Sequence, residues 1–216
     1  MQATRILAIR HGETAWNVDT RIQGQLDIGL NDTGVWQAQR LGLALSEEDI
    51  HTIYSSDLGR AFQTAQAIAH APARVQTVRL IPSTELRERH FGHFQGLTWA
   101  AIETDWPADA KRWRTRDPLW SPLGGESLLV LRERIARCVD ALASQHLGEQ
   151  IVLVAHGGVM DVLYRLATQQ EIQAPRSWHL GNAAINRLLW TPQGLSLVGW
   201  GDVSHFENTT RDESSV

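Results

Sequence analysis

Cysteine is nearly absent from this chain of 216 residues, which contains only Cys138. A single thiol excludes an intramolecular disulfide framework and a cysteine-rich zinc site. A basic excess is missing too, because 20 lysine and arginine residues face 24 aspartate and glutamate residues, for a net charge of −4. This balance argues against a protein dedicated to binding nucleic acid, although it leaves room for a local cationic pocket.

Long hydrophobic runs are also absent. The longest wholly apolar runs, such as Ile151–Ala155, have about five residues, whereas a helix that spans a bilayer needs about 20. The run Ile6–Ile9 is too short for the core of a signal peptide and is followed at once by Arg10. We therefore expect no membrane partner and a cytoplasmic location.

Short apolar strands alternate with amphipathic helices along the chain. Strands are expected at residues 5–10, 52–55, 75–81, 151–155, 184–190 and 195–200. Helices are expected to begin after Asn31, Asp57, Ser127 and Gly158. This alternation predicts an α/β fold with a largely parallel sheet. We expect one domain over residues 1–201, with an irregular helical and loop insertion at about 90–125 and a polar tail over 202–216.

Two of the predicted strands end in a histidine followed by glycine. The strand at 5–10 leads to His11, and the strand at 151–155 leads to His156. Ligands of α/β sheets bind beyond the carboxyl ends of the strands. The two imidazoles can therefore meet at one edge of the sheet, although they are far apart in the sequence.

Arginines near these histidines suggest phosphate chemistry. Arg10 precedes His11, and Arg60 follows the strand at 52–55. A guanidinium group grips phosphoryl oxygens with its planar fork, a neutral imidazole can attack phosphorus, and a carboxylic acid can protonate the leaving oxygen. Glu88 and Glu85 are candidates for that acid. A lone histidine or arginine in such a place is more often structural, so the spacing alone leaves the reaction open.

Five motifs occur together and in order. They are Arg10–Thr14 with Trp16-Asn17 and Arg21–Gly24, Ser55–Ala61 with Gln63–Ala65, Leu86–Gly92 with Gln95-Gly96, Gly124–Ser127, and Val154–Gly158. Over most of residues 5–165 the chain thereby resembles the histidine phosphatase superfamily, also called phosphoglycerate mutase-like. The resemblance implies that family's three-layer sandwich, in which helices flank a mostly parallel central sheet and the insertion walls the active site.

The resemblance also implies roles for individual residues. His11 matches the phosphorylated nucleophile, and Glu88 matches the proton donor, with Glu85 outside the motif's register. The phosphate pocket is implied to contain Arg10, Arg60 and His156. Secondary phosphate contacts are implied for Asn17, Gln23, Gly24 and Gly157. The family's hydrolysis needs no metal or organic cofactor, so the expected ligands are a small phosphomonoester and inorganic phosphate.

Three functions stay open at this stage. The stretch between Glu88 and Glu126-Ser127 is short, which is typical of the family's phosphatases and favours a phosphomonoester hydrolase. A cofactor-dependent phosphoglycerate mutase is the alternative, and a catalytically silent regulatory module is the weaker one. Candidates for a second anion site are Arg89, Arg112, Arg114 and Arg116. A homodimer through the edge of the late strand pair also stays open.

Tryptophan is over-represented, with nine residues against six for phenylalanine and tyrosine together. Four of the nine, Trp99, Trp106, Trp113 and Trp120, are spaced by seven within the insertion. Pro107 and Pro118 argue against one continuous helix. The simpler interpretation is that these rings attach the insertion to the sheet. The sharper hypothesis is that at least one lines the leaving-group side of the pocket.

Overall fold

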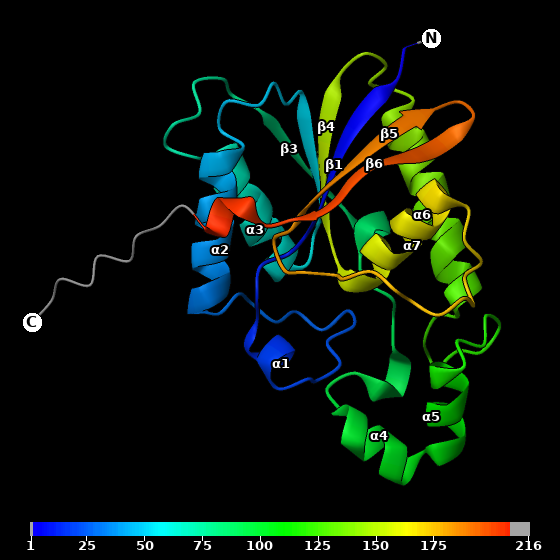
Figure 1. The fold of residues 1–216 in the computed structure, drawn as a ribbon. Helices are drawn as coiled ribbons and strands as arrows, with labels where there is room; N and C mark the ends of the chain where they lie inside the picture. Colours follow the sequence, from blue (N-terminus) through cyan, green and yellow to red (C-terminus); the bar gives the residue numbers. More distant parts are fainter. Residues whose placement is uncertain (1, 208–216) are drawn as a thin grey trace, which may run out of the picture.

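A six-stranded mixed sheet forms the centre of the computed structural model, which describes residues 2–207 (Figure 1). The strand order is β3-β2-β4-β1-β5-β6. The strands are β1 (Thr4–Arg10), β2 (Thr52–Ser56), β3 (Arg79–Ser83), β4 (Gln150–Ala155), β5 (Ile185–Thr191) and β6 (Gly194–Asp202). Strands β1 to β4 run parallel, and β5 pairs antiparallel with both β1 and β6. The predicted α/β fold with a mostly parallel sheet is confirmed.

Two pairs of helices cover the two faces of the sheet. Helices α2 (Asp32–Ala44) and α3 (Gly59–Ala69) lie on one face, and α6 (Leu128–Ala143) and α7 (Gly157–Thr168) lie on the other (Figure 1). In β1, Leu7 and Ile9 belong to the hydrophobic core under α2 and α3, whereas Ile6 and Ala8 belong to the core under α6 and α7. A central strand buried on both faces must be apolar at every position, which explains the continuous apolar runs in β1 and β4.

The expected helix starts are confirmed at two of the three capping residues. The side chains of Asn31 and Ser127 accept hydrogen bonds from the backbone N–H groups of α2 and α6. Asp57 does not cap α3, which begins at Gly59 without a side-chain cap. The Asp57 carboxylate instead accepts from Arg87 Nε at 2.7 Å, because an ion pair with a guanidinium group outcompetes the cap.

Strand β3 lies further along the chain than expected. The pattern predicted residues 75–81 with Pro82 as its end, but β3 spans Arg79–Ser83 and includes Pro82. A proline lacks the N–H that a central strand needs, but β3 is the edge strand of the sheet, where proline is tolerated.

The insertion between β3 and α6 lies beyond the carboxyl ends of the parallel strands (Figure 1). It contains the 3-10 turns η1 (Thr84–Leu86) and η2 (Gly92–Phe94), and the helices α4 (Trp99–Asp105) and α5 (Pro107–Arg114). The helix is interrupted between α4 and α5 at Trp106-Pro107, so the four tryptophans do not share one helix. The short helix α1 (Ala15–Val18) follows β1 at the same end.

Regular secondary structure extends past residue 202, the predicted start of the polar tail. Strand β6 runs through Asp202, and η3 (Ser204–Phe206) follows it. The Phe206 ring lies 5.4 Å from the Trp36 ring, measured between centroids. The rest of the predicted tail, 208–216, lies outside the described residues. No helix among residues 2–207 combines the length and the apolar composition that crossing a bilayer requires.

Candidate active site

His11 lies directly after β1 and is 3% exposed. Its backbone N–H donates to the carbonyl of Ala155 at 3.0 Å, which ties it to the end of β4. The ring atom Nδ1 lies 2.7 Å from the carbonyl oxygen of Gly12. A carbonyl can only accept, so Nδ1 carries the proton and Nε2 keeps its lone pair. The His11 ring thus presents an unprotonated nitrogen.

Gly12 is required by close packing against α2. A side-chain carbon at Gly12 would lie 2.5 Å from the backbone oxygen of Gly34. The N–H of Gly12 also donates to Thr64 Oγ1 of α3 at 3.0 Å. The glycine after His11 therefore lets the loop that carries the imidazole lie directly against α2 and α3.

His156 stands at the start of α7 with its ring centroid 5.3 Å from that of His11. Its Nε2 lies 2.8 Å from the Ser56 hydroxyl at the end of β2. Its Nδ1 is buried and has no hydrogen-bond partner among residues 2–207. If the Ser56 hydroxyl donates to Nε2, Nδ1 carries the proton and is an unused donor.

Arg10 and Arg60 supply buried positive charge beside the histidines. Arg10 donates through Nη1 to the carbonyl of Leu180. Arg60 is 1% exposed and donates to the carbonyls of Gly24 at 2.7 Å and Leu26 at 2.8 Å. In each arginine, Nε is buried without a partner among the residues described. Two guanidinium N–H groups are therefore unused beside the imidazoles.

Burial and the two cations keep both histidines neutral. The pKa of His11 is lowered well below its ordinary value, first by burial and then by the charges of Arg10 and Arg60. The pKa of His156 is lowered in the same way by burial, Arg60, His11 and Arg10. Burial also lowers the pKa of Arg60 to about 10, so both guanidinium groups stay charged near neutral pH while the imidazoles do not.

Glu88 is held by backbone N–H groups. Its Oε2 accepts from the amide of Gly158 at 2.9 Å, and its Oε1 accepts from the amide of Arg89 at 2.7 Å. A side-chain carbon at Gly158 would lie 2.3 Å from Glu88 Oε1. The second glycine after His156 thus makes room for the carboxylate. Glu85, the other candidate acid, is exposed on η1 and has no contact with this group.

An ion pair fixes the loop that carries Glu88. Arg134 of α6 binds Glu126 through Nε at 2.9 Å and Nη2 at 2.8 Å. Its Nη1 donates to the carbonyls of Glu85 at 2.7 Å and Arg87 at 2.9 Å. This bidentate pair is largely buried, so it positions the segment on both sides of Arg87.

The four secondary residues lie around this centre with different contacts. The Asn17 side-chain oxygen accepts from Thr14, and Asn182 donates both to that oxygen at 3.4 Å and to the His11 carbonyl at 2.9 Å. Gln23 is buried, and its side-chain oxygen has no partner among residues 2–207. The Gly24 carbonyl binds Arg60. Gly157 lies against Arg10 and lines the cavity described next.

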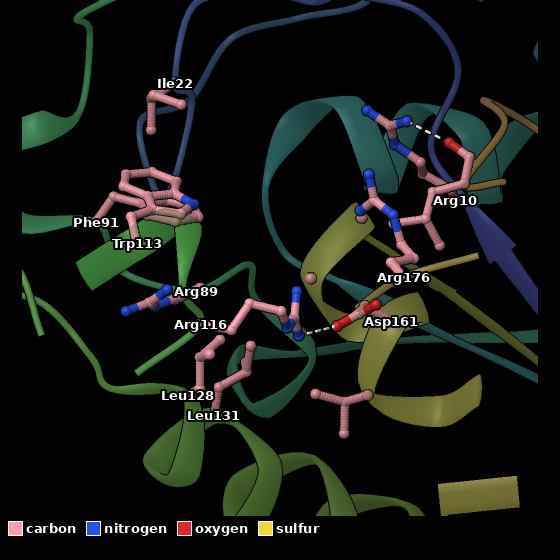
Figure 2. Close-up of a pocket in the computed structure, with 14 residues that line it drawn as sticks. Arg10, Ile22, Arg89, Phe91, Trp113, Arg116, Leu128, Leu131, Asp161 and Arg176 are labelled. Atoms are coloured by element: carbon pink, nitrogen blue, oxygen red, sulfur yellow. Dashed lines mark hydrogen bonds and ion pairs between the residues drawn. The ribbon is translucent and has the colours of Figure 1, made fainter. Parts of the chain in front are cut away.

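A cavity of about 460 Å³ opens from Arg10 toward the insertion. Its lining is cationic, with four arginines and a single carboxylate, that of Asp161 (Figure 2). Figure 2 shows Phe91 and Trp113 on one side, Arg10 and Arg176 on the other, and Arg116 donating to Asp161 between them. The lining arginines are Arg10, Arg89, Arg116 and Arg176.

The arginines of the cavity differ in whether their guanidinium groups already have hydrogen-bond or ion-pair partners. Arg89 donates to the carbonyls of Glu126 and Trp120, and Arg116 binds Asp161 at 2.6 Å. Arg176 has no hydrogen-bond or ion-pair partner within the described part of the chain. Of the other candidates for a second anion site, Arg112 lines a smaller neighbouring cavity, and Arg114 pairs with Glu103 away from the cavity.

The four tryptophans of the insertion form a small core with Phe94, Ile102 and Ala110. Only Trp113 among them also lines the large cavity, where its ring stacks on Phe91 at 4.9 Å and an angle of 4°. The simpler interpretation is wrong in one respect, because these rings pack against one another and other residues of the insertion and not against the sheet. The sharper hypothesis, that at least one ring lines the leaving-group side, stays a prediction. All four rings pack the insertion, and one of them also faces the space beyond Arg10.

Several contacts of this site have no signal in the sequence. Arg134, Arg176 and Asn182 were not among the expected site residues, because each reaches the site across a long stretch of chain. Ser56 lies within the motif Ser55–Ala61 but was not singled out as a site residue. Gly158 did carry a signal, since it completes the motif Val154–Gly158. The structure brings together five of the expected residues at the carboxyl ends of the parallel strands: His11, Arg10, Arg60, His156 and Glu88.

The comparisons with known proteins agree with this arrangement. The sequence model of the histidine phosphatase superfamily (branch 1) matches residues 6–203. The chain belongs to this superfamily.

Three relatives illustrate the range of the similarity. Phosphoglycerate mutase-like protein 4 of Arabidopsis thaliana is 40% identical over 94% of this chain and 87% of its own length. The metal-independent phosphoserine phosphatase of the same plant is 35% identical over 96% of this chain and 85% of its own. A mycobacterial glucosyl-3-phosphoglycerate phosphatase, solved with VO3, matches 93% of this chain and 99% of its own with a TM-score of 0.78 and 34% identity.

Proposed function

We propose that this protein hydrolyses phosphomonoesters through a phosphohistidine intermediate on His11. The observation that carries the proposal is the set of three buried, unpartnered nitrogen atoms around the two imidazoles: Arg10 Nε, Arg60 Nε and His156 Nδ1. Unsatisfied donors are costly in a protein interior. A phosphoryl group supplies the negative oxygens that would satisfy all three.

In the first step, the lone pair on His11 Nε2 attacks phosphorus. A bond forms between Nε2 and phosphorus, and the bond from phosphorus to the ester oxygen breaks. Arg10, Arg60 and His156 stabilise the charge on the equatorial oxygens. Because the low pKa keeps His11 neutral in the free enzyme, the nucleophile needs no base to deprotonate it.

Glu88 serves as the proton donor for the leaving oxygen. Its Oε2 is the less occupied oxygen, since it accepts only from Gly158 whereas Oε1 also accepts from Arg89. Oε2 gives its proton to the departing alkoxide, and the alcohol leaves. Water then loses a proton to the Glu88 carboxylate and attacks phosphorus, which returns His11 and releases inorganic phosphate.

The charge on the transferred group is met by protein side chains alone in this scheme. Two guanidinium groups and the donor on His156 supply what a metal ion supplies in other phosphatases. A metal-independent reaction is therefore part of the proposal, and the name of the Arabidopsis phosphoserine phosphatase relative supports it.

The cavity beyond Arg10 supports a leaving group that carries a second negative charge. Arg176 is a cation without a partner in the described chain, and it lines the same cavity as Arg10. The pKa of Arg10 is lowered first by burial and further by the charge of Arg176. A carboxylate there would relieve the repulsion between the two cations. The relatives' names point the same way, because phosphoserine and glucosyl-3-phosphoglycerate both contain a carboxylate near the phosphate.

A phosphomonoester panel tests both parts of the proposal. The matched pair is 3-phosphoglycerate and glycerol 3-phosphate, which differ mainly by a carboxylate in place of a neutral carbinol. We expect kcat/KM to be higher for 3-phosphoglycerate, and His11→Ala to lower turnover of every ester by at least about 10³-fold. Wild-type turnover by His11→Ala would overturn the mechanism, and equal kcat/KM for the pair would overturn the carboxylate preference alone.

A phosphoglycerate mutase is the second candidate, favoured by the name of the first Arabidopsis relative. A mutase must keep its phosphorylated histidine from water and hold a bisphosphate in two orientations. Incubation with 3-phosphoglycerate and a trace of 2,3-bisphosphoglycerate separates the two activities. We expect phosphate release; rapid isomerisation with little phosphate release would replace the hydrolase by a mutase.

A further inference from the structure

A cluster of two histidines and one glutamate lies at the end of the sheet opposite to His11. His51 directly precedes β2, and His146 and Glu149 lie in the loop between α6 and β4. The N–H of His51 donates to the carbonyl of Gln150 at 2.8 Å, which joins the starts of the two strands. Parallel strands that deliver His11 and His156 at their carboxyl ends thus begin beside this cluster, and the proposed reaction uses none of its members.

The ring and carboxylate atoms of the cluster converge. Glu149 Oε2 lies 2.7 Å from His146 Nδ1, and Glu149 Oε1 lies 3.5 Å from His51 Nδ1. The two imidazole rings are 5.3 Å apart between centroids. One donor atom from each of the three residues falls within 4.8 Å of the other two. Around a tetrahedral zinc ion at 2.0–2.1 Å, ligand atoms are separated by about 3.3 Å, so small side-chain rotations bring these atoms to ligand positions.

His146 is held in place from its far side by Tyr54. The His146 side chain is 9% exposed, and its Nε2 lies 2.9 Å from the Tyr54 hydroxyl. Histidine ligands of metals usually donate their second N–H to an oxygen that orients the ring. The Tyr54 hydroxyl oxygen is an acceptor at that distance and can take this N–H.

We propose that His51, His146 and Glu149 form a site for a divalent transition-metal cation, with Zn²⁺ as the best match. Two imidazoles and one carboxylate are ligands that Zn²⁺ accepts, whereas Mg²⁺ and Ca²⁺ prefer oxygen alone. The exposed fractions of His51 at 52% and Glu149 at 38% leave the fourth position open to water.

Binding requires the proton on His146 to move from Nδ1 to Nε2, with no net release of protons from the cluster. In the free protein, His146 Nδ1–H donates to Glu149 and Nε2 accepts from Tyr54. When Zn²⁺ binds, Nδ1 gives its proton to solvent and becomes a ligand. Nε2 takes up one proton from solvent and donates it to the Tyr54 oxygen, whose own hydroxyl proton rotates away from the ring. The metal takes the position that the proton on His146 Nδ1 had occupied, and no other covalent bond changes.

The site joins the start of β2 to the loop before β4, so its expected effect is on stability and not on catalysis. A cation that binds only the folded protein raises the midpoint of thermal unfolding by mass action. The active-site histidines do not compete well for the same ion, because the charges of Arg10 and Arg60 lie beside them and repel a cation.

Calorimetric titration of the whole protein with Zn²⁺ tests the site. We expect a single site in the wild type, and at least about tenfold weaker affinity in His51→Ala and in Glu149→Gln. Both substitutions are at exposed or half-exposed side chains and preserve the fold. His70→Ala is the matched control, because His70 is an exposed histidine at the end of α3. The affinity of this variant for Zn²⁺ should equal that of the wild type.

Two further measurements keep the result unambiguous. Tyr54→Phe should weaken Zn²⁺ binding by about 10–100-fold, as loss of an orienting partner does, while leaving kcat/KM unchanged. His11→Ala should bind Zn²⁺ as the wild type does. Equal affinity in the wild type and His51→Ala, or loss of binding only in His11→Ala, would overturn the site. Neither result bears on the proposed phosphatase activity.

Discussion

The edge of the sheet and the insertion above it contribute different things to the same cavity. At the edge, short apolar strands end in His11 and His156, whose buried rings are held by the Gly12 carbonyl and the Ser56 hydroxyl. In the insertion, Arg89 and Trp113 reach the cavity from loops and a short helix that have their own small core. The residues proposed for chemistry thus centre on strand ends, at His11, His156 and Arg10, while Arg60 comes from α3 and Glu88 from the loop after η1. Of the residues proposed for selectivity, Trp113 comes from the separately packed wall and Arg176 from the loop between α7 and β5.

Replacing the proposed acid should give the largest difference between esters. Glu88→Gln keeps the contacts with Gly158 and the shape of the site but cannot transfer a proton. We expect kcat for alkyl phosphates to fall by about 10²–10³-fold. The loss should be smaller for p-nitrophenyl phosphate, because its leaving group needs little protonation.

Glu85→Gln is the matched control for this prediction. Glu85 is three residues away on the exposed side of η1, so its variant should retain wild-type kcat on both esters. A large loss in Glu85→Gln with a small loss in Glu88→Gln would reverse the assignment of the acid.

Removing Arg176 should affect only substrates with a charged leaving group. A hydrogen bond to a charged group contributes about 1.5–3 kcal/mol, so Arg176→Ala should lower kcat/KM for 3-phosphoglycerate by roughly 10–100-fold. Glycerol 3-phosphate should change little. Arg114→Ala is the control, because Arg114 pairs with Glu103 outside the cavity; the same loss on both esters would show that Arg176 acts on the fold and not on the substrate.

The neutral histidines at the sheet edge should make the fold sensitive to acid. Their pKa is lowered in the folded protein, so below about pH 6.5 the unfolded chain binds protons that the folded chain does not. The contribution of these histidines to the free energy of unfolding is therefore largest above that pH. It falls as the pH drops, by about 1.4 kcal/mol per pH unit for each histidine. Urea unfolding of the wild type and His11→Asn measures this, and an equal slope in the two proteins would contradict it.

The smallest effect is expected at the aromatic wall. Trp113→Ala should change the ratio of kcat/KM between aryl and alkyl phosphates by a few-fold, because Trp113 lines the cavity with Phe91. Trp106→Ala removes a ring from the same small core and should lower stability without changing the ratio. If both variants lose activity equally on all esters, the wall contributes only to stability.

The same division explains how much could be predicted from the sequence. The strand ends were predictable because a strand buried on both faces leaves a continuous apolar run, and the residue after it must emerge at the edge. The choice of Glu88 over Glu85 came from the family resemblance, through the register of the motif Leu86–Gly92. Both signals are local, and the fold preserves them.

Contacts across long sequence distances could not be predicted in this way. Arg134 fixes the loop around Glu88 from 46 to 49 positions away, and nothing near Arg134 distinguishes it from a solvated helix residue. Asp57 looked like a helix cap because its competitor, Arg87, is far along the chain. Competition between a local and a distant partner is decided only by the folded structure.

Rapid quenching with ³²P-labelled substrate tests whether His11 carries the phosphoryl group. With labelled p-nitrophenyl phosphate, whose leaving group needs little protonation, Glu88→Gln should still form the intermediate but slow its hydrolysis, and so let it accumulate. We expect acid-labile, base-stable label on His11 in the wild type and more of it in Glu88→Gln, with none in His11→Ala. Label on another residue, or turnover without any labelled protein, would contradict the account.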